Sequence, residues 1–468
     1  MSNWLSRWWQ LDEQQELQSA DNPLSPLGEA QRRPAGPLLA LAFGWGFLIT
    51  GLLAGGALGG GVKLWPDLIV YSLTGNAINF AIGALVGYMA YRTGCNSALI
   101  FRSVYGRAGA YVPVIFIALL TIGWQGIVVG AFAQIWTQAP DTALYYGVAI
   151  FAGLLYTGTT LFGVKGLERV GIPAMVILVA VGLYAAWVNI DKLGGIDGVL
   201  QASAERAASS PISGMEAVNI VVGAWIVGAV VMAEYVRFSR SFAVAMAIPF
   251  MVLVVDQLLL HLVGALGVIG SGTADFTAYL ASLSGAAALF GLVGMTLALW
   301  TTGDTNLYLP SVQTASLFRR PKRVTVVICG VLGTILGLGI YQMFLGWIGL
   351  LAMIVPPIVG PVIAEYYLFR GRSLADPLAQ SPANISALVA LVGGGLLAAM
   401  NGRPGWPIHV EMVPALLGLA GSLALLGFIT GSLGPSTAIH FAPMWITFGL
   451  CLTTIVLARR AGPDGMAP

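Results

Sequence analysis

Charged residues are scarce in this chain. Only 9% of the 468 residues are Asp, Glu, Lys or Arg, whereas a soluble domain carries about 25%. The net charge of +2 gives no indication of a nucleic-acid partner. With 57% hydrophobic residues and a mean hydropathy of +0.84, the composition excludes a soluble domain and indicates a polytopic, all-α membrane protein.

Cysteine and histidine are also rare, with three residues of each. Cys95, Cys329 and Cys451 lie in or beside apolar runs, which indicates neither a disulfide framework nor a metal site. No nucleophile–base pair, metal-ligand cluster or phosphate-binding loop is visible. We therefore expect no enzyme and no organic cofactor.

The polar N-terminal segment, residues 1–36, lacks the apolar core of a cleavable signal. A short helix on the membrane surface and a flexible tail are both compatible with it. The helix would use the apolar side chains of Trp4, Leu5, Trp8, Trp9 and Leu11.

Long apolar runs fill most of the remaining chain, and each is long enough to span a bilayer or nearly so. No gap holds a soluble domain, and the longest, 191–215, is predicted to be an external loop. We expect about 12 transmembrane helices, with one C-terminal run short or interfacial, since three runs after Arg372 leave 12 or 13 spans open. The runs are 37–61, 66–91, 108–137, 143–164, 168–190, 216–237, 242–270, 283–312, 324–343, 345–369, 384–401, 411–430 and 438–458.

Positive charge gives the orientation, because cytoplasmic loops are enriched in Lys and Arg. A cytoplasmic N-terminus in the inner (cytoplasmic) membrane leaves four basic residues outside: Lys63, Lys192, Arg206 and Arg403. Most of the others then fall inside: Arg92, Arg102, Arg107, Lys165, Arg169, Arg237, Arg240, Arg319, Arg320, Lys322, Arg323, Arg370 and Arg372.

Two spans, five apart, are interrupted by glycine: the first contains GWGFLITGLLAGGALGGG and the sixth EAVNIVVGAWIVGAVVMAEYVRFSR. Gly223 and Gly228 bracket Trp225, so the sixth span is predicted to break there. Broken spans at matching places favour an inverted-repeat transporter with its site at the midplane. Close packing of two Gly-rich helices is the alternative.

The third span contains TIGWQGIVVG, in which Thr121, Trp124 and Val128 share a helix face. Trp124 and Trp225 are candidate walls of a slot for a planar ligand, or else packed core residues. In the eighth span, Ala298, Thr301 and Thr302 share a face whose oxygens suit a small hard cation. Alternatively, both hydroxyls bond back to their own helix.

Buried ionisable residues are candidates for function. Asp256 and His261 lie in the seventh span, with Gln257 near His261, and Asp304 lies in the eighth. A His–Asp proton relay is one interpretation, and a satisfied structural pair is the favoured one.

Five stretches taken in order resemble nucleobase–cation symporter family 1, and among its members the bacterial cytosine permeases most closely. The similarity extends over about residues 37–372. The stretches are GYMAYRTG (87–94), FRSVYGRAGAYVP (101–113), AEYVRFSR (233–240), LWTTGDTNLY (299–308) and GWIGLLAMIVPPIVGPVIAEYY (346–367).

The resemblance implies a LeuT-like five-plus-five inverted repeat, with repeats at 37–190 and 216–369, followed by C-terminal spans in 370–468. It implies alternating access, with a heterocycle held between Trp124 and Trp225. It also implies a cation ligated by the backbone of Gly44, Phe47 and Ala298 and by the hydroxyls of Thr301 and Thr302.

Several polar side chains of the family are absent here. Cytosine permeases have Gln, Ser and Asn where this chain has Thr121, Val227 and Ala298, and hydantoin transporters have Gln where it has Leu48. Thr121 itself, Gln125, Asn306 or exposed backbone around Gly223 are the candidate replacements.

These features predict a secondary active symporter that imports a nucleobase or related heterocycle, such as cytosine, a purine or a hydantoin-like ring. Sodium is the favoured coupling ion. A proton carried by Asp304 or Asp256 is the alternative coupling ion. Two alternative functions are a proton-coupled transporter of another small solute and a membrane receptor without transport.

Overall fold

The computed structural model describes residues 10, 22–162, 164–272, 285–379, 381–400 and 414–429. Three features lie outside the described residues: the apolar side chains of the predicted surface helix (Trp4, Leu5, Trp8, Trp9 and Leu11), the last apolar run, and Arg459–Arg460. The choice between 12 and 13 spans therefore stays a prediction.

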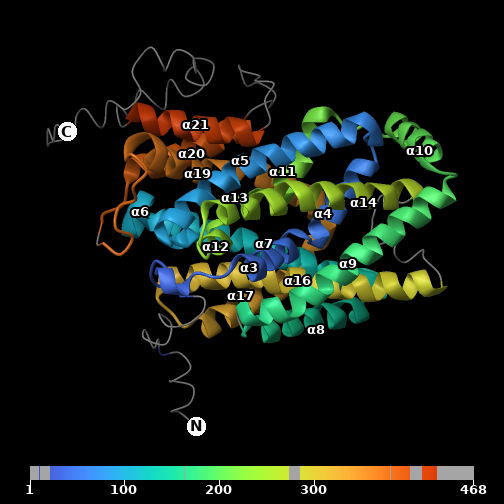
Figure 1. Cartoon of the computed structure of the whole chain (residues 1–468), viewed down its shortest axis with the longest axis horizontal. Helices are drawn as coiled ribbons and strands as arrows, with labels where there is room; N and C mark the ends of the chain where they lie inside the picture. Colours follow the sequence, from blue (N-terminus) through green and yellow to red (C-terminus); the bar gives the residue numbers. More distant parts are fainter. Residues whose placement is uncertain are drawn as a thin grey trace, which may run out of the picture. The chain divides into compact units, whose positions relative to one another are not determined.

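The described residues form helices and contain no strand (Figure 1). The first part of the chain contains η1 (Glu29–Gln31), α3 (Ala35–Gly46), α4 (Ile49–Gly59), η2 (Leu64–Leu68), α5 (Ile69–Thr93), α6 (Ser97–Gly109), α7 (Tyr111–Thr137), α8 (Ala143–Thr160), α9 (Val164–Lys192) and α10 (Ile196–Ser209). The second contains α11 (Gly214–Val230), α12 (Ala233–Val236), α13 (Phe242–Phe250), η3 (Met251–Val255), α14 (Asp256–Ser271), α16 (Gly285–Phe318), α17 (Lys322–Gly337), η4 (Ile340–Met343), α18 (Phe344–Ile354), α19 (Pro356–Ile363), η5 (Ala364–Phe369), α20 (Ile385–Met400) and α21 (Pro414–Ile429).

Four continuous helical stretches among these are long and apolar enough to cross a membrane: Leu64–Thr93, Tyr111–Thr137, Phe242–Ser271 and Ile340–Phe369. Two bent helix pairs raise the number to six if each pair is one span. These lengths and compositions fit an integral membrane protein.

The first predicted span is interrupted at Phe47–Leu48, where α3 and α4 meet at a bend of 42°. The sixth is helical through Gly223 and Gly228, and its interruption lies at Val231–Met232, between α11 and α12. The prediction that the helix breaks at the two glycines is wrong, because both allow close packing of a continuous helix instead.

The segment 191–215, predicted to be an external loop, contains the helix α10. Its position outside the membrane stays a prediction. One other expectation about a loop needs correction. The predicted cytoplasmic loop at 313–323 is much shorter, since α16 continues to Phe318 and α17 begins at Lys322.

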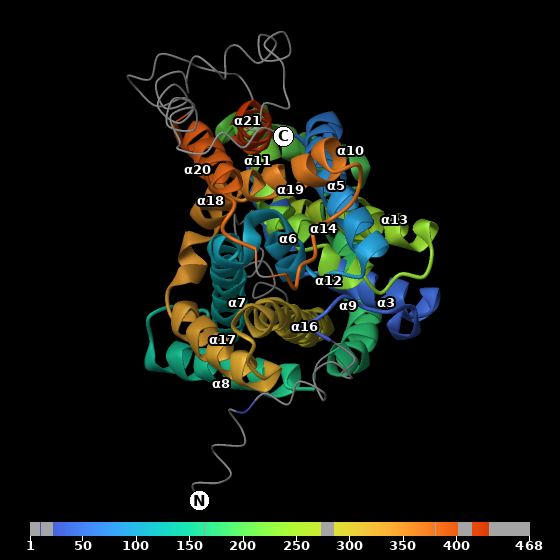
Figure 2. The ribbon, with the colours of Figure 1, turned by 90° about the vertical axis from the view of Figure 1, so that its left-hand side faces the viewer.

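Helix contacts occur in matched pairs. The first span packs on the seventh (α4 with α14), and the second packs on the sixth (α5 with α11). Likewise α8 contacts α16 while α17 contacts α7, and α7 contacts α16. If each of spans one to five is exchanged with the span five places later, the first contact of each pair becomes the second, and the α7–α16 contact becomes itself. A five-plus-five repeat produces this pattern. Figure 2 shows α7, α16, α17 and α8 grouped together.

The chain divides into two compact units, and the cut does not follow the repeats. One comprises residues 1–99 and 111–351, and the other comprises 100–110 and 352–468. In the second unit, α19, α20 and α21 pack on one another, and Tyr105 donates a hydrogen bond to the Ile358 carbonyl (2.6 Å).

Part of the polar N-terminal segment is ordered against the helices. Arg32 donates to the carbonyls of Ser239 (2.8 Å) and Tyr91 (2.9 Å), and the Leu27 N–H donates to the Gly94 carbonyl. Residues 22–33 thus join the ends of the second and sixth spans, and the expectation of a flexible tail is wrong for this stretch.

Candidate substrate and cation site

The interruption of the first span frees two backbone carbonyls. Phe47 has φ −85° and ψ 61°, the geometry of an inverse γ-turn. The Leu48 N–H therefore donates to the Gly46 carbonyl (2.9 Å), not to Gly44 four residues back. The Gly51 N–H similarly donates to Leu48 (3.1 Å), not to Phe47. The carbonyls of Gly44 and Phe47 lose their usual helical donors, so they are available as ligands.

The seventh span supports this interruption. Gln257 Nε2 donates to the Gly46 carbonyl at 2.7 Å. A Cβ on Gly46 would collide with the Asp256 carboxyl and would lie 2.9 Å from the Val252 Cα. Asp256 and His261 are both fully buried, and no hydrogen-bond partner is found for either side chain among the described residues. The expectation of a satisfied Asp–His pair is therefore wrong.

The two threonines of α16 differ. Thr301 Oγ1 donates to the Ala298 carbonyl (3.0 Å), as the packing alternative expected. Thr302 is fully buried, and its hydroxyl has no hydrogen-bond partner among the described residues. Since α16 contacts both α3 and α4, the helix with the threonines lies next to the interrupted span.

Asp304 belongs to a different polar cluster. Thr159 Oγ1 on α8 donates to its carboxylate, and Trp300 Nε1 donates to the same hydroxyl (3.2 Å). Two residues along a helix correspond to about 200° of rotation, so Asp304 and Thr302 face nearly opposite ways. Asp304 is tied to the fourth span and is separated from the threonine face.

Trp225 lies in an aromatic cluster beside the interrupted span. Its ring meets Trp45 edge to face (centroids 5.4 Å apart), and Trp45 stacks on Tyr235 (4.1 Å). Gly228 makes room for it, because a Cβ there would lie 2.6 Å from Trp225 Cε3. The indole is 4% exposed, and its Nε1 has no hydrogen-bond partner among the described residues.

Trp124, on α7, is 5% exposed and meets Phe344 edge to face (6.2 Å). The side chains predicted beside it have other contacts. Thr121 Oγ1 donates to the carbonyls of Ile117 (3.0 Å) and Ala118 (2.9 Å) in its own helix. Gln125 is fully buried, and neither amide atom has a hydrogen-bond partner among the described residues. It lies against Gly333 of α17, where a Cβ would approach its Cγ to 2.5 Å.

The remaining candidates are all buried. Leu48 is in the interruption itself, in an extended conformation that begins α4. Gly223 faces the backbone of Ile348 in α18, so it serves close helix packing and is not exposed backbone. Val227 is 3% exposed and Asn306 is 7% exposed, and the Asn306 Nδ2 has no hydrogen-bond partner among the described residues.

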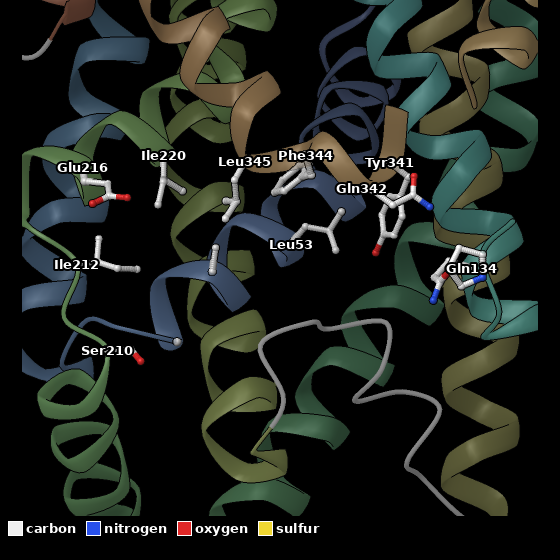
Figure 3. A pocket seen from close by; sticks show the side chains of 13 residues that line it. Leu53, Gln134, Ser210, Ile212, Glu216, Ile220, Tyr341, Gln342, Phe344 and Leu345 are labelled. Carbon is white, nitrogen blue, oxygen red and sulfur yellow. The ribbon is translucent and has the colours of Figure 1, made fainter. Parts of the chain in front are cut away.

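A cavity of about 640 Å³ lies near this region, between α4, α7, α11 and the η4–α18 segment. Figure 3 shows apolar side chains, among them Leu53, Ile220 and Phe344, between Glu216 on one side and Gln134 with Gln342 on the other. Phe344 also contacts Trp124. Phe344 therefore contacts both the cavity and one of the two candidate tryptophans.

Sequence reasoning missed four residues here: Trp45, Tyr235, Phe344 and the backbone-capping role of Gln257. Trp45 stands within the GWG of the interrupted span, and that motif could have signalled it. The other three depend on contacts between distant segments, for which the sequence carries no comparable signal.

Comparison with known proteins gives a consistent result. The family model described as "Permease for cytosine/purines, uracil, thiamine, allantoin" matches residues 35–402. The cytosine permease of Escherichia coli is 27% identical over 412 residues, covering 87% of this chain and 94% of the relative. The hydantoin permease of Microbacterium maritypicum is 24% identical over 393 residues, covering 77% and 78%.

Solved structures share the fold. Mhp1, a nucleobase-cation-symport-1 family transporter in a closed conformation with bromovinylhydantoin bound, matches with TM-score 0.70 at 21% identity, covering 92% of this chain and 97% of its own. A Na+-coupled sialic acid symporter matches with TM-score 0.64 at 10% identity, covering 86% and 91%. The chain therefore belongs to nucleobase–cation symporter family 1 and is an integral membrane transporter with the LeuT-like fold, not an enzyme.

Proposed function

We propose that this protein is a secondary active symporter that imports a nucleobase-like heterocycle together with sodium by alternating access. The interruption at Phe47–Leu48 carries the proposal, because it frees two carbonyls next to the helix with Thr302. The names of the relatives support the substrate class: two are permeases for cytosine and hydantoin, and Mhp1 is described with a hydantoin bound.

Trp124 and Trp225 are proposed to hold the heterocycle between their rings. Stacking on an aromatic ring stabilises a base by about 1–3 kcal/mol and tolerates different bases. Selectivity must then come from hydrogen bonds to the ring edges. The unpartnered Trp225 Nε1 and Asn306 Nδ2 are suitable donors for carbonyl or ring-nitrogen acceptors. Gln125 and Thr121 are weaker candidates, since one packs on α17 and the other bonds to its own helix.

Sodium is proposed to bind between α3–α4 and α16. Its ligands would be the carbonyls of Gly44, Phe47 and Ala298 and the hydroxyls of Thr301 and Thr302. The residues fit this role, because two of the carbonyls have lost their helical donors and the buried Thr302 hydroxyl has no hydrogen-bond partner in the part of the chain that the structure describes. Neutral oxygens suffice for a single positive charge, so no carboxylate is required.

The cavity of Figure 3 is proposed to be the entry route, with Phe344 as part of the barrier above Trp124. The polar side chains at its sides, Glu216, Gln134 and Gln342, would hydrogen-bond a hydrated heterocycle. The apolar side chains between them would favour loss of water before the heterocycle stacks on the tryptophans. Sodium binding at the interruption would favour one conformation of the first span. Sodium and the heterocycle would thereby promote each other's binding.

The substrate is tested by uptake in proteoliposomes. Radiolabelled cytosine, adenine, uracil and a 5-substituted hydantoin are compared under an inward sodium gradient, and each is also tested as a thermal stabiliser of the purified protein. We expect at least one heterocycle to accumulate and to stabilise the protein more strongly when sodium is present. Binding without gradient-driven accumulation would instead support a non-transporting receptor.

Sodium and proton coupling are separated by varying sodium at constant pH and pH at constant sodium. We expect substrate affinity to depend on sodium in the wild type and equally in Asp304→Asn and Asp256→Asn. If substrate affinity does not change with sodium concentration but is lost in either carboxyl variant, the coupling ion is a proton and not sodium.

A further inference from the structure

A second hollow lies away from the candidate site, on the outer surface of α7, α16 and α17. It has a volume of about 420 Å³, and we name it the α7–α17 groove. Four α7 residues line one side at helical spacing, and five α17 residues line the other, with Thr314 and Phe318 of α16 between them. They are Ile115, Ala118, Leu119 and Ile122 on α7, and Val324, Thr325, Ile328, Cys329 and Leu332 on α17. The three helices contact one another (Figure 2).

The groove offers an apolar surface, because the hydroxyl groups of its two threonines are already hydrogen-bonded to backbone carbonyls. Thr314 Oγ1 donates to the Pro310 carbonyl (2.6 Å), and Thr325 Oγ1 bonds to the carbonyls of Ser311 and Lys322 (2.8 Å each). The rim is open, since Leu119 is 52% exposed and Ile328 is 46% exposed. A hydrocarbon chain suits this lining, and a polar solute does not.

One end of the groove carries positive charge. Arg320 is exposed and is itself a lining residue. Arg319 precedes it in the connection between α16 and α17, and Lys322 and Arg323 follow in the first turn of α17. From Val324 to Leu332 the groove follows α17 for about 12 Å along its axis. A basic group at one end of an apolar channel of this length matches a lipid with an anionic headgroup and an acyl chain.

We propose that the α7–α17 groove binds an anionic phospholipid, with one acyl chain between α7 and α17 and the headgroup phosphate at Arg320. The floor of the groove includes Ile122, the residue after Thr121, and Cys329; these two belong to one buried cluster with Leu307 of α16. An occupied groove would therefore brace the third, eighth and ninth spans against one another.

The test is native mass spectrometry of the delipidated full-length protein in detergent. Phosphatidylglycerol and phosphatidylcholine with identical chains are titrated in turn, and inorganic phosphate is added as a competitor. We expect one phosphatidylglycerol to be retained in preference to phosphatidylcholine. Arg320→Gln should reduce that preference roughly five-fold. Arg92→Gln, which changes an exposed arginine in the last turn of α5, should leave it unchanged.

Filling the groove is the second arm. Leu119→Trp, and independently Leu332→Phe, should reduce retention of the lipid, while Ile335→Trp on the exposed face of α17 outside the groove should not. Each variant is first checked for a monodisperse elution profile. Equal retention of the two lipids, unchanged retention in both filled variants, or full displacement by inorganic phosphate would overturn the proposal.

Discussion

At the residue scale, two adjacent threonines with the same side chain have different surroundings. Thr301 bonds to its own helix, whereas the Thr302 hydroxyl is buried without a hydrogen-bond partner among the described residues. A buried hydroxyl that lacks a bond destabilises a protein by about 1–3 kcal/mol. An ion that accepts its lone pair would offset that loss, which is why Thr302 is the more informative position to change.

We expect Thr302→Ala to weaken sodium binding and, through coupling, substrate binding by about ten-fold or more, while Thr302→Ser preserves both. Sodium-dependent substrate affinity in proteoliposomes is the measurement. Thr74→Ala removes an exposed hydroxyl that bonds to its own helix and serves as the control. Wild-type sodium dependence in Thr302→Ala would exclude this hydroxyl as a ligand.

The second residue-scale prediction concerns Trp225, whose ring is held by Trp45 and Gly228. Trp225→Ala should lower substrate affinity by about 5–150-fold, which corresponds to the loss of about 1–3 kcal/mol of stacking. Trp225→Phe keeps a flat ring and should lose less. Equilibrium binding of the transported heterocycle measures both variants, and Trp187→Ala, at a 63% exposed position, should bind like the wild type. Equal affinities in all three would leave Trp225 as a packing residue.

At the element scale, glycine determines how closely helices approach. Gly223 faces the Ile348 backbone, and a Cβ there would lie 3.2 Å from the Ile348 Cα and closer still to its carbonyl. The same applies along α4, where Gly55 and Gly59 face the backbone of α14. These helices approach closely because small residues leave room for the backbones.

We therefore expect Gly223→Ala to destabilise the protein by about 1–3 kcal/mol through overpacking against α18. Gly147→Ala on α8, which has nothing within 4 Å of the added Cβ, should leave stability unchanged or slightly raise it because alanine favours helix. Thermal unfolding in detergent compares the two. A Gly223→Ala variant as stable as Gly147→Ala would mean that α11 and α18 can move apart freely.

At the scale of the whole molecule, orientation in the membrane remains a prediction from charge. Four basic residues cluster where α16 ends and α17 begins: Arg319 and Arg320 in the short connection, and Lys322 and Arg323 in the first turn of α17. Such clusters are expected on the cytoplasmic side. The same orientation places the cavity of Figure 3 on the external side, since it includes Ser210 and Ile212 from the segment predicted to be external.

Cysteine labelling of intact cells tests this orientation in a variant without native cysteines. Arg320→Cys, at an exposed position, should resist a membrane-impermeant maleimide until the cells are permeabilised. Ser210→Cys, also exposed, should be labelled at once. The reverse pattern would invert the topology and would turn the proposed importer's entry cavity toward the cytoplasm.

The sequence by itself determined the class and the family. Scarce charge and long apolar runs require helices that satisfy their own backbone in lipid, and five motifs in order identified the family and with it the fold. Local composition also predicted an interruption in the glycine-rich stretch GWGFLITGLLAGGALGGG, in which Phe47 makes the turn. These features depend on the hydropathy, charge and helix propensity of residues that are close together in the sequence.

Tertiary structure decided which polar groups are available. Gln125 and Thr121 have the right chemistry in the sequence, yet one lies against Gly333 and the other bonds to its own helix. Asp304 lies two residues from Thr302 but is held by α8, because a helix turns the two side chains nearly opposite ways. Gly223 and Gly228 do not break their helix, since a neighbouring backbone and an indole fill the space they leave. For Gln125, Asp304 and Gly223 the contacting group belongs to a segment distant in sequence. That information exists only once the segments are packed together.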